Sequence, residues 1–436
     1  MPQGVAAGVA AGPSTPSPII LAGAGYSAKT APVEAVREAF DLAAKQLGGR
    51  SIDLIFMFAS PEHSLKAEEL SGAIASCVAA IQPPEVARAE QNPSESESEP
   101  EFYFPRPIVL GCTAQGIISQ DKEIEEGPAL SIWMAHLPGA ELHPFFLSIE
   151  YTADGMSLVG LPLFVPSFHS ALVLSEPNSF PTQILLDGFN AEHQGMPIVG
   201  GQASGGGPGQ NFLIVNDVVT RSGAVGVLVG GDVKLQAIVS QGCKPIGKPL
   251  IVTAAEGNVI HMLGGRPPLA RLREAAAHLP PEEQAKILQN LQVGVIIDEL
   301  KTNPGRGDFL VRGLLHADME SGAIAIGDVV RVGQTVQFQL RDAGTADEDL
   351  KSMLTAYGDD GAPSGALMFT CNGRGARLFG SPDHDAAELQ HSFPGLATAG
   401  MFCAGEIGPI GGLNFLHGFT ASIALFENST GTNKDS

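Results

Sequence analysis

Residues 400–420 read GMFCAGEIGPIGGLNFLHGFT, a stretch that holds six glycines together with a cysteine, a glutamate, an asparagine and a histidine. Glycine loses more conformational freedom on folding than any other residue, so a segment this rich in glycine indicates tight turns or close approach of the backbone to a bound group. We therefore take this stretch as the starting point for both the fold and the candidate site.

The order of elements around this stretch occurs three times along the chain. Each copy starts with a short apolar strand that ends in small polar residues: IFMFASPEHS (55–64), ALVLSEPNSF (171–180) and ALMFTCNGRG (366–375). Helical segments follow, starting near Ser64, Thr182 and Asp385. The chain then returns as a strand that breaks into glycine-rich turns: PIVLGCTAQGII (107–118), MPIVGGQASGGG (196–207) and TAGMFCAGEIG (398–408). A further apolar strand closes each copy, so the sequence predicts three strand-helix-strand-strand units.

A different region separates the second and third units. It contains several short strand-like runs between residues 250 and 342, interrupted by two helices that each open with proline, and it ends in a helix over 345–358. The sequence thus predicts an α/β protein with two modules of mixed β-sheets and helices packed outside. We expect one module over 18–238 and the other over 239–428, with a disordered leader (1–17), an acidic disordered insertion (90–101) and a disordered tail (429–436).

Composition excludes some classes of function. The 47 acidic side chains outnumber the 25 basic ones, giving a formal charge of −22, which argues against an extended nucleic-acid-binding face. The five cysteines form no CxxC motif and indicate free thiols in a reducing compartment. No apolar run reaches the roughly 18 to 20 residues that span a bilayer. We expect a soluble intracellular protein, cytoplasmic, or in an organelle if a targeting peptide has been removed, and its oligomeric state is left open.

Two glycine motifs resemble nucleotide-binding loops but lack the required context. Gly23, Gly25 and Ala28 match GxGxxG/A, yet no helix follows directly to meet a pyrophosphate. In GCKPIGKP the residue after Lys248 is Pro249, where a P-loop has a hydroxyl side chain that holds magnesium. We therefore predict no cofactor, and no spacing of ligands predicts a metal site.

The candidate site residues gather near the third unit. Arg374 offers a planar donor fork and Glu406 an anionic partner for an ammonium, so together they could bind a zwitterion such as an amino acid. Asn372, Asn414 and His417 complete this set. The alternative is purely structural: an Arg374–Glu406 salt bridge that braces neighbouring strand ends, with His417 capping a backbone carbonyl.

Cysteines also lie beside the glycine-rich turns. Cys112, Cys371 and Cys403 each occupy a predicted strand end, and we include Cys112, its neighbour Thr113, and Cys403 among the candidate ligand contacts. Burial as small hydrophobic side chains is the alternative, and zinc binding or nucleophilic catalysis is a further one.

These residues resemble the FIST family, in which an N-terminal and a C-terminal FIST domain occur in tandem. The resemblance rests mainly on QGCKPIGKPLIVTAAEGNVI, CNGRGARLFG, GMFCAGEIGP and NFLHGFTASIALF, and extends from about Tyr26 to Phe426. It implies an intracellular sensory module for small ligands, with amino acids a leading suggestion, and it implies binding without turnover. No F-box segment and no signalling output domain is recognisable here, so neither role is carried over.

The sequence therefore predicts a sensor of small, amino-acid-like ligands that is not an enzyme. A protein-binding scaffold that uses its acidic surface is the first alternative. A thiol-dependent enzyme, in which Cys403 or Cys243 acts with His417, is the second. The predicted partners are a small molecule and a possible protein, with no nucleic acid and no membrane span.

Overall fold

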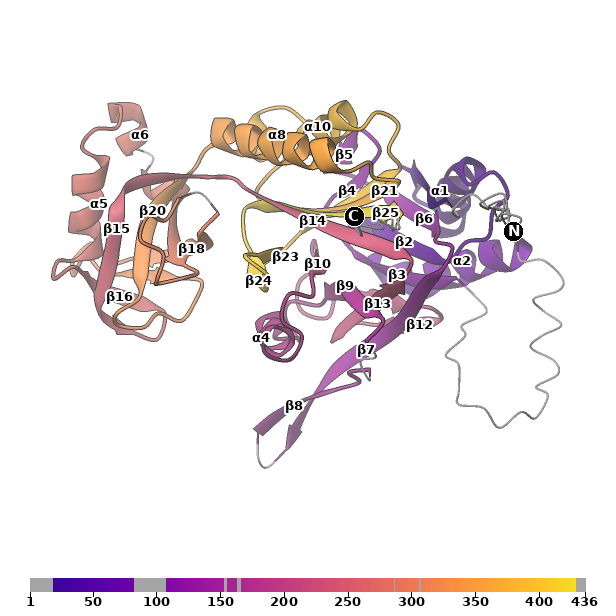
Figure 1. The fold of residues 1–436 in the computed structure, drawn as a ribbon, viewed down its shortest axis with the longest axis horizontal. Helices are drawn as coiled ribbons and strands as arrows, with labels where there is room; N and C mark the ends of the chain where they lie inside the picture. Colours follow the sequence, from indigo (N-terminus) through magenta and orange to yellow (C-terminus); the bar gives the residue numbers. More distant parts are fainter. Residues whose placement is uncertain are drawn as a thin grey trace, which may run out of the picture.

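The computed structural model describes residues 19–81, 107–152, 155–162, 166–285, 287–305 and 307–428. The predicted leader, acidic insertion and tail lie outside these residues. The described chain confirms a mixed α/β architecture, with three mixed sheets and one closed barrel. Figure 1 shows the sheets and their helices as one body, with the barrel at its end.

The first sheet has the strand order β1-β6-β2-β3-β11-β12. Its strands span Leu21–Ser27 (β1), Leu130–His136 (β6), Leu54–Ala59 (β2), Ile108–Thr113 (β3), Leu213–Val215 (β11) and Val218–Thr220 (β12). Parallel β2 and β3 are joined through η1 (Pro61–Lys66) and α2 (Ala67–Ile81), and α1 (Pro32–Gln46) lies beside α2. Both faces of β2 are buried, so its side chains alternate between the helices and the interior instead of between protein and solvent.

The second sheet has the order β24-β23-β10-β9-β13-β7-β8. Its strands span Leu413–His417 (β24), Glu406–Ile410 (β23), Ile198–Gln202 (β10), Phe168–Ser175 (β9), Ala224–Gly231 (β13), Ala140–Thr152 (β7) and Gly155–Val159 (β8). Parallel β9 and β10 are joined by α4 (Thr182–Glu192). The β7–β8 hairpin projects away from the body (Figure 1).

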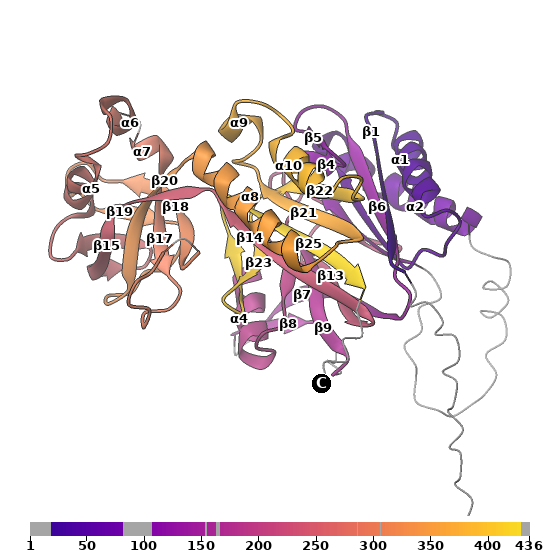
Figure 2. The ribbon, with the colours of Figure 1, turned by 45° about the horizontal axis from the view of Figure 1, so that its top comes forward.

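The third sheet has the order β14-β25-β21-β22-β4-β5. Its strands span Val233–Gln241 (β14), Thr420–Asn428 (β25), Gly365–Cys371 (β21), Thr398–Cys403 (β22), Ile117–Ser119 (β4) and Lys122–Ile124 (β5). Three helices belong to this unit: α8 (Ala343–Asp360), α9 (Ala376–Phe379) and α10 (His384–Ser392). Figure 2 shows α8 and α10 in front of this sheet, and α1 and α2 at the right-hand side of the body.

The three predicted units are confirmed, and they share one topology. In each, the opening strand pairs in parallel with the return strand and antiparallel with the closing strand. The hairpin that follows the return strand joins a different unit's sheet. Thus β4–β5 of the first unit extends the third sheet, β11–β12 of the second extends the first, and β23–β24 of the third extends the second. The exchange is cyclic.

The glycine-rich turns meet where the hairpins cross over. Equivalent backbone bonds link them: Thr113 N–H donates to the Phe212 carbonyl (3.1 Å), Gln202 to Gly405 (2.8 Å) and Phe402 to Gly116 (2.9 Å). The turns therefore converge, and they bond directly to one another.

Glycine is required within the return strands because the neighbouring backbone comes very close. A Cβ at Gly200 would lie 1.9 Å from the Val173 carbonyl oxygen, and one at Gly400 would lie 2.0 Å from that of Met368. No other residue could occupy these two positions without moving the opening strand.

One hydrophobic core lies between the three sheets. Trp133 of the first sheet, Val227 of the second and Phe369 of the third are fully buried in it. The Trp133 indole N–H donates to the Ala397 carbonyl (3.0 Å), so its one polar atom is satisfied. Separate cores fill the space between each sheet and its own helices.

The strand-rich region between the second and third units is a closed barrel of order β15-β16-β19-β18-β17-β20. Its strands span Cys243–Glu256 (β15), Val259–Leu263 (β16), Ile324–Ile326 (β19), Phe309–Ala317 (β18), Leu291–Ile296 (β17) and Thr335–Arg341 (β20), and its helices Pro268–Ala276 (α5), Pro281–Ala285 (α6) and Ile287–Asn290 (α7). The chain enters after Gly242 and leaves at Asp342, whose N–H donates to the Gly242 carbonyl (3.2 Å). The barrel is therefore an insertion between β14 and α8 of the third unit. The expected module boundary near Val239 falls within β14 and stays a prediction.

Both rejected nucleotide motifs lie in strands. Gly23 and Gly25 belong to β1, where a Cβ would lie 2.1 Å from the Ala43 carbonyl oxygen and 2.4 Å from that of Ala39, respectively. These glycines let α1 pack closely on the sheet. Across the described residues, no helix is long and apolar enough to cross a membrane.

Candidate functional site

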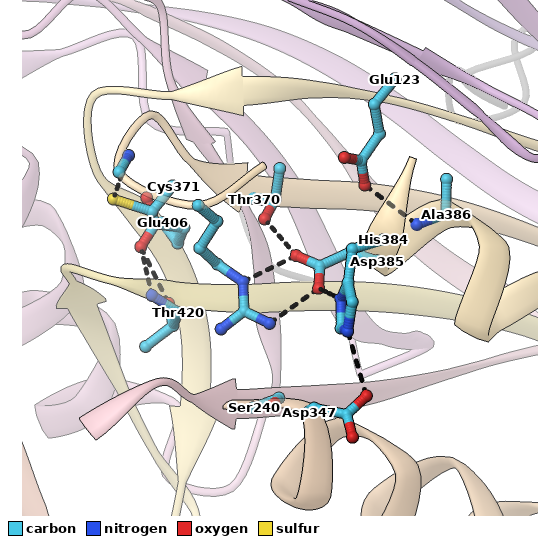
Figure 3. Close-up of polar contacts among 12 residues, drawn as sticks. Glu123, Ser240, Asp347, Thr370, Cys371, His384, Asp385, Ala386, Glu406 and Thr420 are labelled. Atoms are coloured by element: carbon cyan, nitrogen blue, oxygen red, sulfur yellow. Dashed lines mark hydrogen bonds and ion pairs between the residues drawn. The ribbon is translucent and has the colours of Figure 1, made fainter. Parts of the chain in front are cut away.

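The site is built around the end of β21. Arg374 follows this strand by three residues, and its N–H donates to the Cys371 carbonyl (2.8 Å). Its guanidinium is fully buried and forms a two-pronged ion pair with Asp385 at the start of α10, with Nε–Oδ2 at 2.6 Å and Nη2–Oδ1 at 2.8 Å (Figure 3). Burial raises the pKa of Asp385, but the charge and hydrogen bonds of Arg374 outweigh it and hold that pKa well below its usual range.

Asp385 is the residue that the sequence analysis missed. The structural alternative paired Arg374 with Glu406, and this pairing is wrong, because the buried partner of Arg374 is Asp385. The signal was available: Asp385 begins the short helix of the third unit, and an acidic residue in a first helical turn beside an arginine-bearing loop is a natural ion-pair partner.

One nitrogen of Arg374 is unused by the ion pair. Nη1 is buried and has no hydrogen-bond partner among the described residues. A Cβ added to Gly242 would lie 3.0 Å from Nη1 and 3.0 Å from the Phe419 carbonyl oxygen. Glycine at 242 therefore lets the backbone lie close to Nη1, where a methyl group would crowd it. A buried charged donor without a partner is costly unless something else binds it.

Glu406 presents the complementary group. This carboxyl is fully buried at the start of β23, and its Oε2 accepts from the N–H (3.1 Å) and hydroxyl (2.9 Å) of Thr420. Its Oε1 has no partner among the described residues. Burial raises the pKa of Glu406 to about 8, although hydrogen bonds from Thr420 and Cys371 and the charge of Arg374 oppose the rise. Glu406 is thus largely protonated at neutral pH.

Asn372 supplies a third unpaired atom, because its buried Oδ1 has no partner in the described chain. Its backbone N–H donates to the Cys403 carbonyl (3.0 Å), which fixes the start of the turn. The charges of Arg374 and Glu406 both act on the Cys371 thiol, and Cys371 and Glu406 lie side by side in Figure 3. Near the end of β21, a guanidinium donor, a carboxyl oxygen and an amide oxygen therefore lack partners within the described part of the chain.

Asn414 and His417 hold the β23–β24 hairpin. The Asn414 amide accepts from the N–H of Ile198 (2.8 Å) and donates to the Met196 carbonyl (2.8 Å), which ties β24 to the start of β10. His417 Nε2 bonds the Gly408 carbonyl (2.9 Å), the capping role that the structural alternative gave it. Burial lowers the pKa of His417 to about 4, so the ring is neutral, and its Nδ1 has no partner among the described residues.

The remaining candidates belong to the central core. Cys112 and Cys403 are fully buried there, with Cys112 Sγ 3.2 Å from the sulfur of Met401. The Thr113 hydroxyl accepts from the Phe212 N–H (2.8 Å) and so secures a donated strand.

Burial also determines the acid-base state of the thiols. It raises the pKa of Cys112 and Cys403 far above the usual value, and those of Cys243 and Cys371 to about 12. All four thiols are therefore protonated at neutral pH, the opposite of an activated nucleophile.

A pocket opens close to Arg374, between the barrel and α8. Its volume is about 360 Å³, and it is lined by Gln241, Gly307, Asp349, Ser352 and Met353. Gln241 directly precedes Gly242, which faces Arg374 Nη1. One lining residue of the pocket is therefore the chain neighbour of the glycine that contacts Arg374.

Comparison with known families gives two adjacent matches. Residues 97–266 match the FIST N domain, and residues 269–409 match the FIST C domain. The chain belongs to the FIST family. FIST domains are generally associated with signalling and ligand sensing.

Relatives support this membership. An uncharacterised protein of Mycobacterium tuberculosis is 47% identical over 321 residues, which covers 73% of this chain and 83% of the relative. An uncharacterised protein of Mycobacterium bovis is 46% identical over 323 residues, with the same shares covered. Neither name specifies a ligand.

Proposed function

We propose that this FIST protein senses a small zwitterionic ligand, of the amino-acid class, at the end of β21. The observation that carries the proposal is that three buried atoms have no partner among the described residues: Arg374 Nη1 and Asn372 Oδ1 in the turn after β21, and Oε1 of Glu406, whose charge acts on Arg374. A ligand carboxylate would accept from Nη1, and a ligand ammonium would donate to the two oxygens.

The burial of these groups favours recognition over catalysis. Arg374 and Glu406 are 0% exposed, so a ligand would have to enter through a local opening, and the pocket beside Gln241 is the proposed route. The protonated thiols and the neutral, carbonyl-bound His417 offer no activated nucleophile. Binding without turnover is therefore the proposed activity.

The test is a thermal shift assay of the full chain against amino acids and small organic acids. A ligand that binds only the folded state raises Tm in a saturable way. We expect Gly242→Ala, which places a methyl group against Nη1, and Asn372→Ala to abolish the shift while the variants remain folded. Asn178→Ala is the matched control, because Asn178 occupies the corresponding turn of the second unit, and it should retain the shift.

Proton linkage gives a second readout. Glu406 must ionise to accept an ammonium, so the affinity for an amino acid should rise by up to about tenfold per pH unit as pH approaches 8, and then level off. Glu406→Gln should remove this dependence. A ligand that shifts Tm equally in wild type, Gly242→Ala and Asn372→Ala would refute the assignment of the site.

A further inference from the structure

Three potential metal ligands meet on the outer side of the third unit. His384 and Glu388 lie one turn apart on α10, and Asp347 faces them from α8. One ligand atom from each lies within 4.8 Å of the others, and His384 Nε2 is 3.0 Å from an Asp347 oxygen (Figure 3). The three side chains are 17 to 30% exposed, so the cluster can be reached from solvent.

His384 is held in the orientation that metal-binding histidines adopt. Its Nδ1 lies 3.0 Å from a carboxylate oxygen of Asp385, which is itself buried and fixed by Arg374. Its ring stacks on Phe379 with centroids 3.4 Å apart and planes 8° from parallel. A carboxylate on the far ring nitrogen sets the tautomer and aims the other nitrogen at the metal.

The cluster already holds a positive charge. Lys351 Nζ lies 2.8 Å from Asp347 and 3.4 Å from Glu388. This lysine is 49% exposed and flexible, so its ammonium can move into solvent when another cation takes its place.

We propose that Asp347, His384 and Glu388 form a binding site for a divalent transition metal of the zinc type. One imidazole nitrogen and two carboxylate oxygens supply three ligands of the kinds that zinc accepts, and water would complete the coordination. Binding displaces the Lys351 ammonium, and His384 Nε2 coordinates in its deprotonated form. The site was invisible to spacing rules, since 37 residues separate Asp347 from His384, and it does not depend on the proposed ligand at Arg374.

The experiment is calorimetric titration of chelator-treated full-length protein with Zn²⁺, together with visible absorption after Co²⁺ addition. We expect one site, with at least tenfold weaker binding in His384→Ala and in Glu388→Ala, and loss of the Co²⁺ ligand-field bands. His278→Ala removes an exposed histidine of the barrel and should leave binding unchanged, which separates the site from general attraction to an acidic protein.

The decisive variant is Lys351→Met. It removes the competing ammonium at an exposed position and should tighten Zn²⁺ binding at least severalfold while the fold is retained. Binding that is unchanged by Lys351→Met, or that is equal in wild type and His384→Ala, would overturn the proposal.

Discussion

The turns that follow β9 and β21 occupy the same position in two copies of one unit, yet they treat buried polar groups differently. After β9, the Glu176 carboxylate accepts from the N–H and amide of Asn178 (3.0 and 2.9 Å) and from Asn211 (3.2 Å). After β21, Asn372, Arg374 and Glu406 each keep an unpaired buried atom. One turn is a closed structural network, and the other retains the capacity to bind something.

The three units also differ at one equivalent position, where the third unit has a carboxyl group. The comparison concerns the first residue of each donated hairpin, which pairs with the return strand of another unit. This residue is Ile117 in the first unit and Leu213 in the second, both buried and apolar, but it is Glu406 in the third. Placing a carboxyl at an otherwise apolar position costs stability. Such a cost is typical of functional sites.

The largest expected effect comes from breaking the ion pair between Arg374 and Asp385, which holds the turn after β21. Asp385→Asn leaves the guanidinium of Arg374 buried without a counter-charge, and it should lower the free energy of unfolding by about 3–5 kcal/mol. Urea titration measures the change. Lys122→Ala, which removes an exposed ion pair with Asp383, is the control and should change the free energy of unfolding far less. Equal losses in both would mean that the buried pair has no special role.

Replacing Glu176 or Glu406 by glutamine should change the stability of the protein in opposite directions. Glu176→Gln turns an amide donor toward groups that already donate, and should destabilise by about 1–3 kcal/mol. Glu406 has a raised pKa, so its protonated form stabilises the fold fully below about pH 4.5, the ordinary value, and this contribution is lost as pH rises to about 8. Glu406→Gln should therefore become progressively more stable than wild type between these pH values.

The measurement is urea unfolding of both variants and wild type between pH 5 and 8.5. A difference between Glu406→Gln and wild type that stays constant over this range would show that Glu406 ionises normally. The same result would mean that Glu406 and Glu176 do not differ in how their environment treats the ionised carboxylate.

The smallest effect concerns the asparagines. Asn178→Ala removes the side-chain amide donor to Glu176 but keeps the backbone N–H donor, and it should cost about 1–2 kcal/mol. Asn372→Ala deletes an oxygen that has no partner among the described residues and should stay within about 0.5 kcal/mol. Thermal unfolding of both variants distinguishes them. If Asn372→Ala lowered stability as much as Asn178→Ala, the Asn372 side chain would have a hydrogen-bond partner in solution. The turn after β21 would then be as fully bonded as the turn after β9.

Much of the fold could be predicted from the sequence because strand and helix patterns are local. The opening and return strands of all three units lie where the apolar runs placed them, and the helices follow at Ala67, Thr182 and His384. The exchange of hairpins could not be predicted, since β4 has the same local pattern whichever sheet it joins. Closure of the barrel likewise depends on pairing between β15 and β20, about ninety residues apart.

The residue types of the site could be predicted from the sequence, but their hydrogen-bond and ion-pair partners could not. Arg374 and Glu406 were identifiable as charges in a glycine-rich region, and both prove to be fully buried. Their partners, Asp385 and Thr420, depend on which helix and strand lie beside β21. Asn414 and Thr113 have the polarity of ligand contacts, yet each secures a strand instead.

The donated hairpin gives the proposed site a mechanical property. Arg374 is attached to the third sheet, whereas Glu406 starts β23, a strand of the second sheet. A molecule held by both side chains would therefore act as a crosslink between two layers of the protein. Binding or release of this molecule would therefore shift β23 and β24 relative to the third sheet. Because β24 contacts α4, the shift would reach that helix.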